Sequence, residues 1–282
     1  MKTYLVPVDF SKASLHAAEF AAALSHQTDV DHLILLNAYY VSVYETILPN
    51  TDMVQVTEEE IEHNAATRLA QLEQVKKDLQ SKVRPGVEIT THLNRTHLLR
   101  AVVENSISRK VDLVVLGSRG NSSNDDALLG SHVIRISKAS PVPVIVVPPA
   151  YNFEKIKRVV VACDFTKVNE NVPLEALKKI LTHKKLELLV VNVDNKTRSD
   201  EQNAEREGEK SVLYGMLKEF NPQYFYVNKP NIIDGILQFA AEKDAQLVIA
   251  LPHKYSFLQS LIHNSVSQQL AESSAAPVLM LK

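Results

Sequence analysis

Short apolar runs alternate along the chain with segments in which apolar residues recur every three or four positions. In the first half the runs are rich in Val, Ile and Leu and cover residues 4–8, 33–37, 87–92, 113–116 and 144–147. Helical spacing covers residues 13–25, 58–79 and 97–108. A short continuous apolar run is typical of a strand buried on both faces. Strands that alternate with helices therefore predict an α/β fold with a parallel sheet covered on both sides.

The second half repeats this order, with apolar runs at residues 158–162, 186–191, 223–227, 246–250 and 278–281. Residues 4–13 match 159–168, and Asn37 matches Asn192, both at a shift of 155 residues. Further on, residues 110–117 match 244–251 and residues 140–147 match 274–281, both at a shift of 134. Matches that keep the same order along both halves indicate an internal duplication.

The two shifts differ by 21 residues (155 minus 134), so the first half carries an insertion between Ala38 and about Val87. Pro148-Pro149 closes the first unit. We therefore expect two tandem domains of five strands each, residues 1–149 and 150–282.

Composition narrows the class of protein. The 282 residues are 45% hydrophobic and 23% charged, which is typical of a globular chain. The formal net charge of −2 offers no basic surface for nucleic acid. The single Cys163 excludes an internal disulfide and fits a reducing compartment. Neither a signal peptide nor a membrane-length apolar run is apparent, so we expect a cytoplasmic protein without a membrane partner.

Glycine is concentrated in one place. The chain has seven glycines, and three of them, Gly117, Gly120 and Gly130, lie in the segment GSRGNSSNDDALLGS. Open parallel sheets bind ligands beyond the carboxyl ends of the strands, where the strand order reverses. Glycines let backbone N–H groups approach an anion, and a helix that begins at Ser131 would direct its own N–H groups at a phosphate. A phosphate loop explains the three glycines together better than a tight turn does.

Asp9, at the end of the first predicted strand, has two interpretations. It would accept hydrogen bonds from a ribose hydroxyl if the first and fourth strands are neighbours. It would equally cap the first helix, because Asp-Phe-Ser precedes the first helical turn. Ser131 has a similar alternative as an ordinary N-cap.

The spacing Gly117-x2-Gly120-x9-Gly130-Ser131 resembles the nucleotide-binding signature of the universal stress protein A family. The resemblance covers the whole chain as two tandem domains. It implies a Rossmann-like, adenine nucleotide alpha hydrolase-like fold with strand order 3-2-1-4-5 and a site for ATP. Carried over by position, the nucleotide-binding set is Pro7, Val8, Asp9, Ala38, Leu116, Gly117, Arg119, Gly120, Gly130, Ser131, His132 and Val133.

Within that set, the resemblance implies that Pro7 and Asp9 flank the adenine and ribose and that the backbone of Ala38 contacts the adenine. The family often has Val and then Thr or Ser after the Gly-Ser pair, whereas His132 and Val133 stand here. The hydroxyl that the family places at Val133 is therefore missing. His132 would either replace it as a donor or be a solvated helix residue.

Metal binding and catalysis have little support in the sequence. Asp125-Asp126 would either bring Mg²⁺ to a bound triphosphate or form a solvated loop tip. The chain has no G-x-x-x-x-G-K-[ST] or G-x-G-x-x-G motif and no serine nucleophile elbow. We therefore assign no catalytic residue.

The second half has lost the glycine pattern. At the shift of 134, Leu251, Lys254 and Asn264 replace the three glycines, and only Ser265 is kept. We expect one ATP site, in the first domain of a stress-response module that signals by its bound state. The alternatives are a slow ATPase or self-phosphorylating enzyme, and a nucleotide-free protein that binds a partner.

The fifth strands of the two halves are apolar and short of charge, so bare edges there would favour aggregation. We expect them to pair inside the chain as a pseudo-twofold arrangement of the two domains, burying Val144, Val146, Val278 and Met280 together. The insertion, around residues 39–60, leaves a homodimer of the full chain open.

Overall fold

The computed structural model describes residues 2–40, 57–118, 131–163, 186–194, 200–250 and 276–281. The strands are β1 Lys2–Pro7, β2 Val30–Ala38, β3 Glu88–Asn94, β4 Leu113–Gly117, β5 Val144–Val147, β6 Arg158–Ala162, β7 Glu187–Asp194, β8 Gln223–Asn228, β9 Leu247–Ala250 and β10 Val278–Met280. The helices are α1 Lys12–Leu24, α3 Glu58–Gln80, α4 Leu98–Ser108, α5 Ser131–Ala139, α8 Asp200–Leu217 and α9 Ile232–Glu242, with a 3₁₀ turn η1 at Lys218–Phe220. Each predicted apolar run contains a strand, with boundaries that moved by at most three residues.

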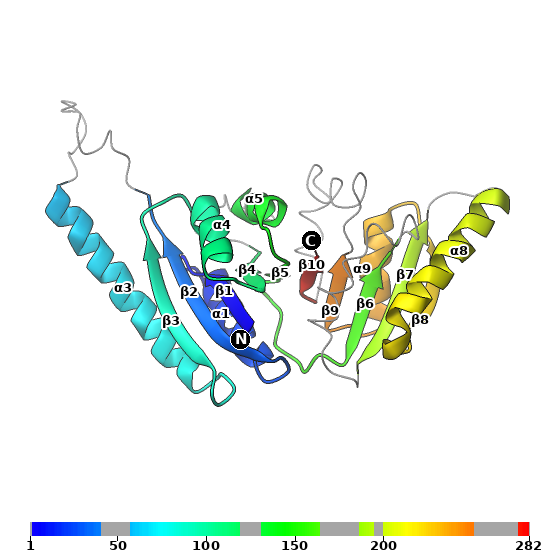
Figure 1. Cartoon of the computed structure of the whole chain (residues 1–282), viewed down its shortest axis with the longest axis horizontal. Helices are drawn as coiled ribbons and strands as arrows, with labels where there is room; N and C mark the ends of the chain where they lie inside the picture. Colours follow the sequence, from blue (N-terminus) through cyan, green and yellow to red (C-terminus); the bar gives the residue numbers. More distant parts are fainter. Residues whose placement is uncertain are drawn as a thin grey trace, which may run out of the picture.

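The described strands form one ten-stranded sheet in the order β3-β2-β1-β4-β5-β10-β9-β6-β7-β8. Each half therefore has the predicted order 3-2-1-4-5, and the strands within a half are parallel. Figure 1 shows the halves side by side, with β5 and β10 between them and the helices α3 and α8 at opposite ends. The predicted α/β class is confirmed.

Local sequence explains where the helices start. Ser11 is the N-cap of α1, and its side chain accepts a hydrogen bond from the backbone N–H of Ser14. Thr57 and Glu60 form a capping box at the start of α3, where three glutamates occupy the first turn. Side-chain acceptors and negative charge at this end satisfy free N–H groups and complement the helix dipole.

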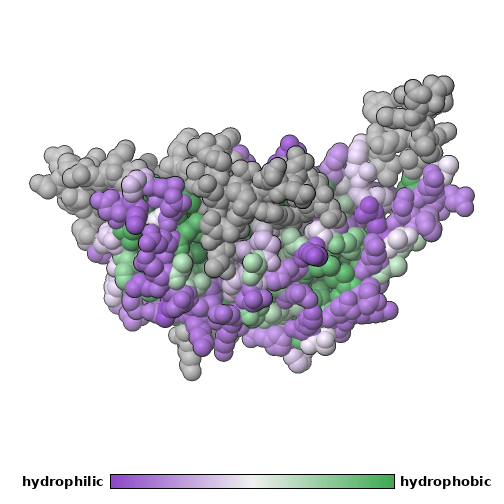
Figure 2. Space-filling view, turned by 180° about the vertical axis from the view of Figure 1, so that it is seen from behind, coloured by the Kyte–Doolittle hydropathy of each residue, from purple (hydrophilic) through white to green (hydrophobic). Residues whose placement is uncertain are grey.

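Three apolar clusters hold the layers together. One cluster joins α1, α3 and α8 to a single face of the sheet and runs through both halves without a break. On the other face, α4 and α5 cover the first half, and α9 covers the second. Because the first cluster is continuous, we expect the two halves to stabilise one another. Seen from behind, the described surface is largely hydrophilic, with apolar residues showing only in limited areas (Figure 2).

The predicted pairing of the fifth strands within the chain is present. β5 and β10 run antiparallel, with Val146 opposite Val278 and Val144 opposite Met280. Val144, Val146 and Met280 are buried in the cluster under α4 and α5. The expectation that Val278 joins them is wrong in detail, because Val278 is only partly buried and packs against the cluster under α9.

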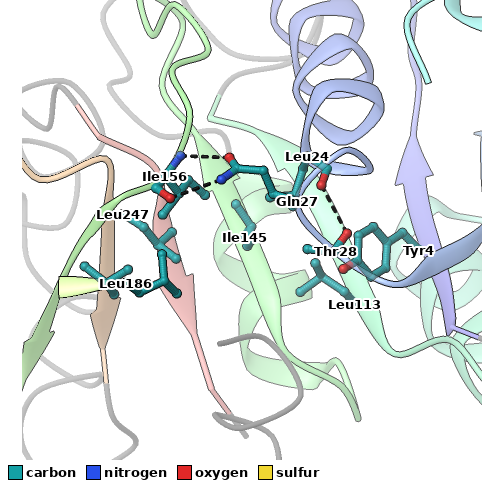
Figure 3. Close-up of a pocket in the computed structure, with 10 residues that line it drawn as sticks. Tyr4, Leu24, Gln27, Thr28, Leu113, Ile145, Ile156, Leu186 and Leu247 are labelled. Atoms are coloured by element: carbon teal, nitrogen blue, oxygen red, sulfur yellow. Dashed lines mark hydrogen bonds between the residues drawn. The ribbon is translucent and has the colours of Figure 1, made fainter. Parts of the chain in front are cut away.

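The connection between the halves is also tied to the first domain. The Gln27 amide donates to the backbone carbonyl of Ile156 at 3.1 Å and accepts from its N–H at 2.8 Å (Figure 3). Phe20 packs edge-on against Tyr151 and Phe153 of the connection. A cavity of about 30 Å³ lies beside these contacts, which is space for a water molecule and not for an organic ligand.

Hydrogen bonds repeat in the two halves as the duplication predicts. The Asn37 side chain donates to the carbonyl of Val8 at 2.6 Å, and Asn192 donates to the carbonyl of Cys163 at 2.8 Å. The core pairs Leu79 with Val83 and Leu213 with Leu217 correspond at the shift of 134. The insertion therefore ends before the last turns of α3, and residues 41–56 within it lie outside the described residues. No helix in the described ranges is long and apolar enough to cross a membrane.

Candidate functional site

The candidate site lies where the strand order reverses. From β1 the chain proceeds outward through β2 and β3, and it then returns to place β4 on the other side of β1. β1 and β4 are direct neighbours, with Tyr4 opposite Leu113. The segments that follow their carboxyl ends therefore begin, at Val8 and at Ser118, at the reversal of strand order, which is where open parallel sheets bind ligands.

Asp9 supports the first helix without capping it. Its Oδ1 accepts hydrogen bonds from the backbone N–H of Ser11 at 3.0 Å and from the Ser11 hydroxyl at 2.6 Å. The N-cap is Ser11 itself, so the interpretation of Asp9 as the capping residue is wrong. The backbone N–H of Asp9 donates to the Ser14 hydroxyl at 3.3 Å. These bonds hold the half-buried Asp9 at the end of β1 in a fixed orientation.

Phe10, between Asp9 and the cap, has a φ of 65°. A bulky side chain in this left-handed region is uncommon and costs of order 1–3 kcal/mol. The hydrogen bonds between Asp9, Ser11 and Ser14 on either side offset that cost. Strain of this kind concentrates at binding sites, and here it lies at the end of β1 in the predicted site.

Gly117 has a structural reason that the sequence did not reveal. A Cβ added to it would lie 2.4 Å from the carbonyl oxygen of Ala13 and 2.6 Å from its carbonyl carbon. The first turn of α1 thus packs directly against the end of β4, and any side chain there would displace it. This glycine is required by the helix whether or not a ligand is bound.

Several predicted site residues face the core. Pro7 and Val8 are buried, and the N–H of Val8 donates to the carbonyl of Leu36 at 2.8 Å. Leu116 and Ala38 pack into the cluster under α4 and α5. The side chains of Pro7, Val8 and Leu116 are therefore turned into the core, whereas Ala38 is only partly buried.

α5 begins at Ser131, as the phosphate-loop hypothesis expects. Val133 is buried in the same cluster as Leu116, so its side chain packs in the core. The group that Val133 would offer to a ligand is its backbone N–H, in the first turn of α5. His132 is half-buried. The remaining members of the predicted set, Arg119, Gly120 and Gly130, lie outside the described residues, as do Asp125 and Asp126.

Ser118 was missed. It directly follows Gly117, is 1% exposed, and its hydroxyl has no hydrogen-bond partner among the residues that the structure describes. A buried hydroxyl without a partner costs free energy, and the groups that remain so in a native structure often await a ligand or a water molecule. Its place inside the glycine motif was the available signal, because a hydroxyl beside backbone N–H groups suits an anionic ligand.

Comparison with known proteins agrees with this fold. The model of the universal stress protein family matches residues 1–148 and again residues 155–282. A universal stress protein of Methanocaldococcus jannaschii is 26% identical over 147 residues, which are 52% of this chain and 81% of that protein.

Solved structures match the whole chain. A universal stress protein from Archaeoglobus fulgidus superposes with a TM-score of 0.67 at 17% identity, over 99% of this chain and 96% of that one. A putative universal stress protein from Pseudomonas aeruginosa gives a TM-score of 0.61 at 14% identity, over 100% of this chain and 93% of that one.

The fold and the repeated match define a tandem protein with two α/β domains of one kind. The chain belongs to the universal stress protein family.

Proposed function

We propose that the chain is a stress-response module of the cytoplasm that binds one adenine nucleotide, ATP, in its first domain. The observation that carries the proposal is the position of the glycine motif. It begins with Gly117 at the end of β4, where the strand order reverses, and β4 is the direct neighbour of β1, the strand that leads into the Asp9 turn.

The groups around this point suit a nucleotide. The carboxylate of Asp9 would accept from a ribose hydroxyl, and the main chain at Ala38 and Leu116 would contact the base and sugar. The first turn of α5, with the glycine segment before it, would supply N–H donors for the phosphates. The buried hydroxyl of Ser118 adds a donor at the same strand end.

The second domain supports a single site. It keeps the hydrogen bond from Asn192 to the carbonyl of Cys163, which corresponds to the bond from Asn37 to Val8 in the first domain. It does not keep the glycines, which are Leu251, Lys254 and Asn264 in that domain. The strand framework is thus common to both halves, whereas the residue types needed for close approach to phosphate are confined to one.

The test is calorimetric titration of the full chain with ATP, together with a variant and a matched glycine control. We expect one ATP per chain. Gly120→Val should weaken binding at least about tenfold, which corresponds to ~1.4 kcal/mol. Gly215→Val is the control, because Gly215 lies in α8 with no atom within 4 Å of an added Cβ.

Two equivalent sites per chain would contradict the interpretation of the second domain. Unchanged ATP affinity in Gly120→Val would indicate that the glycine segment forms a turn and does not contact the phosphates. No binding by the wild-type chain would refute the nucleotide proposal. Release of ADP during the titration would indicate the enzyme alternative.

A further inference from the structure

A cationic cluster lies at the carboxyl ends of β2 and β3, beside the candidate site. We define the Tyr39 cluster as Tyr39, Arg68 and Arg95. Tyr39 directly follows β2, is 9% exposed, and donates its N–H to the carbonyl of Asn94 at the end of β3. Nε of Arg95 donates to the Tyr39 hydroxyl at 2.9 Å, and Cζ of Arg68 lies 5.2 Å from the centre of the Tyr39 ring. Both guanidinium groups are thus held against one phenol.

The cluster is connected to the base end of the candidate site. Arg68 reaches from α3 to Oδ1 of Asn37 at 3.5 Å. The other end of the same amide, Nδ2, donates to the carbonyl of Val8 at 2.6 Å. A chain of contacts therefore runs from the end of β1 through β2 to the end of β3.

The positive charge of the cluster is not neutralised within the described part of the chain. A guanidinium has five N–H donors, and the partners of Arg68 and Arg95 among the described residues are a phenol and an amide. Among the other described arginines, Arg100 is paired with Glu104 at 2.6 Å and Arg158 with Glu187 at 2.8 Å. Arg84 donates to two backbone carbonyls, and Arg109 contacts the side chains of Asn105 and His92. Two arginines with no carboxylate partner among the described residues, one of them half-buried, suit a phosphoryl ligand, which guanidinium groups bind with paired hydrogen bonds.

Comparison with the second domain shows which contacts of this arrangement are common to both domains and which residues differ. It retains the asparagine bond, from Asn192 to the carbonyl of Cys163. At the shifts of the duplication, however, Tyr39 corresponds to Asp194 and Arg68 to Gln202. Arg95 corresponds to Lys229, so one positive charge is kept at this place in the second domain. The pair of arginines around a tyrosine therefore occurs only in the domain that keeps the glycine motif, although the strand ends beneath it occur in both.

The strand order determines which part of a nucleotide could reach the cluster. In the order β3-β2-β1-β4, the cluster lies on the β2 side of β1, and the glycine segment follows β4 on the other side. A 5′-phosphate chain directed at the glycine segment and α5 points away from Arg68 and Arg95. A group that meets these arginines must come from the ribose or base end.

We infer that Arg68 and Arg95 form an anion subsite for a phosphoryl group on one of the ribose 2′- and 3′-oxygens of the bound nucleotide, while the other keeps the hydroxyl that donates to Asp9. The inference rests on the proposed nucleotide site. It extends that proposal by giving the first domain a preference for a nucleotide with phosphate at both ends of the sugar.

The experiment titrates the full chain with four ligands: AMP, ATP, adenosine 2′,5′-bisphosphate and adenosine 3′,5′-bisphosphate. At least one bisphosphate should bind the wild type about tenfold more tightly than AMP. Arg68→Gln, Arg95→Gln and the double variant should lose this advantage stepwise, with less than about a twofold change in AMP affinity. Arg100→Gln is the matched control, because Arg100 is exposed like Arg95 and lies five residues further on, in the first turn of α4, but is paired with Glu104.

The wild-type comparison needs no variant to fold, so each outcome is decisive. If ATP and AMP bind and neither bisphosphate binds more tightly than AMP, the anion subsite is refuted and the nucleotide site stands. An advantage that persists in the folded double variant also refutes the role of these arginines. If none of the four ligands binds, the nucleotide site and the subsite fall together.

Discussion

Replacement of Gly117 by alanine tests the interpretation that this glycine serves helix packing and not the ligand. The added Cβ would lie 2.4 Å from the carbonyl oxygen of Ala13, against at least 3.4 Å for an ordinary contact. Relief of the overlap requires the first turn of α1 to move by about 1 Å from β4. The carbonyl belongs to a helix that is packed into the largest core cluster, so the movement must disturb close-packed neighbours.

We expect Gly117→Ala to lower the free energy of unfolding by about 1–3 kcal/mol, the usual cost of overpacking a core. Backbone strain adds nothing, because Gly117 does not have a positive φ. Equilibrium unfolding in urea, followed by circular dichroism, measures the loss. Gly215→Ala is the control, since it adds the same methyl group where no atom lies within 4 Å, and it should stabilise the chain by up to about 1 kcal/mol as a better helix former.

A second variant sharpens the test. The closest atoms to the new methyl group are the backbone oxygen and carbon of Ala13, so removing the Ala13 side chain cannot relieve the overlap. We therefore expect Ala13→Gly to fail to rescue Gly117→Ala. A Gly117→Ala protein as stable as the wild type, or a full rescue by Ala13→Gly, would refute the packing argument.

Three further predictions follow from other contacts. Asn37→Ala and Asn192→Ala should each cost about 1–3 kcal/mol in urea unfolding, because each leaves a strand-end carbonyl without its donor; a loss in only one of them would argue against a shared structural role. Burial raises the pKa of Tyr4 to about 12, and a hydrogen bond from Thr28 partly opposes this shift. The folded state therefore favours neutral Tyr4. The stability that this preference provides is present below pH ~10 and is lost as the pH rises toward 12. Tyr4→Phe should flatten that alkaline loss in a pH series of unfolding curves, and an unchanged slope would contradict it. Residues 1–150 expressed alone should dimerise or aggregate in light scattering, because β5 loses its pairing with β10, and a soluble monomer at high concentration would show that the edge does not need its partner.

Much of the fold was predictable because it follows from local patterns. Strands buried on both faces appear as apolar runs, and amphipathic helices show a spacing of three or four residues, so each of the ten strands was found within three residues. The two shifts of the repeat identified the tandem organisation and the insertion near α3. The pairing of β5 with β10 was predicted from two uncharged edges, although Val278 packs with a different cluster than expected.

The candidate site was predictable only in outline. The glycine spacing and the ends of the first and fourth predicted strands indicated a site at the reversal of strand order, and β1 and β4 are neighbours there. Which residue caps α1 depends on the backbone angles around Phe10, whose positive φ lets Asp9 fold onto Ser11. No sequence pattern signals a left-handed phenylalanine, so both interpretations of Asp9 looked alike.

The sequence by itself determined the class of fold, the duplication and the confinement of the glycine motif to one half, because each is written in spacing along the chain. Only the tertiary structure decided which residues from different segments of the chain come into contact. Ala13 explains Gly117 only once α1 lies against β4, and Arg68 meets Asn37 and Tyr39 across about thirty residues of sequence. The physical reason is that contacts between elements depend on helix placement to within an ångström, and hydrophobic periodicity specifies which face is buried but not which atoms touch.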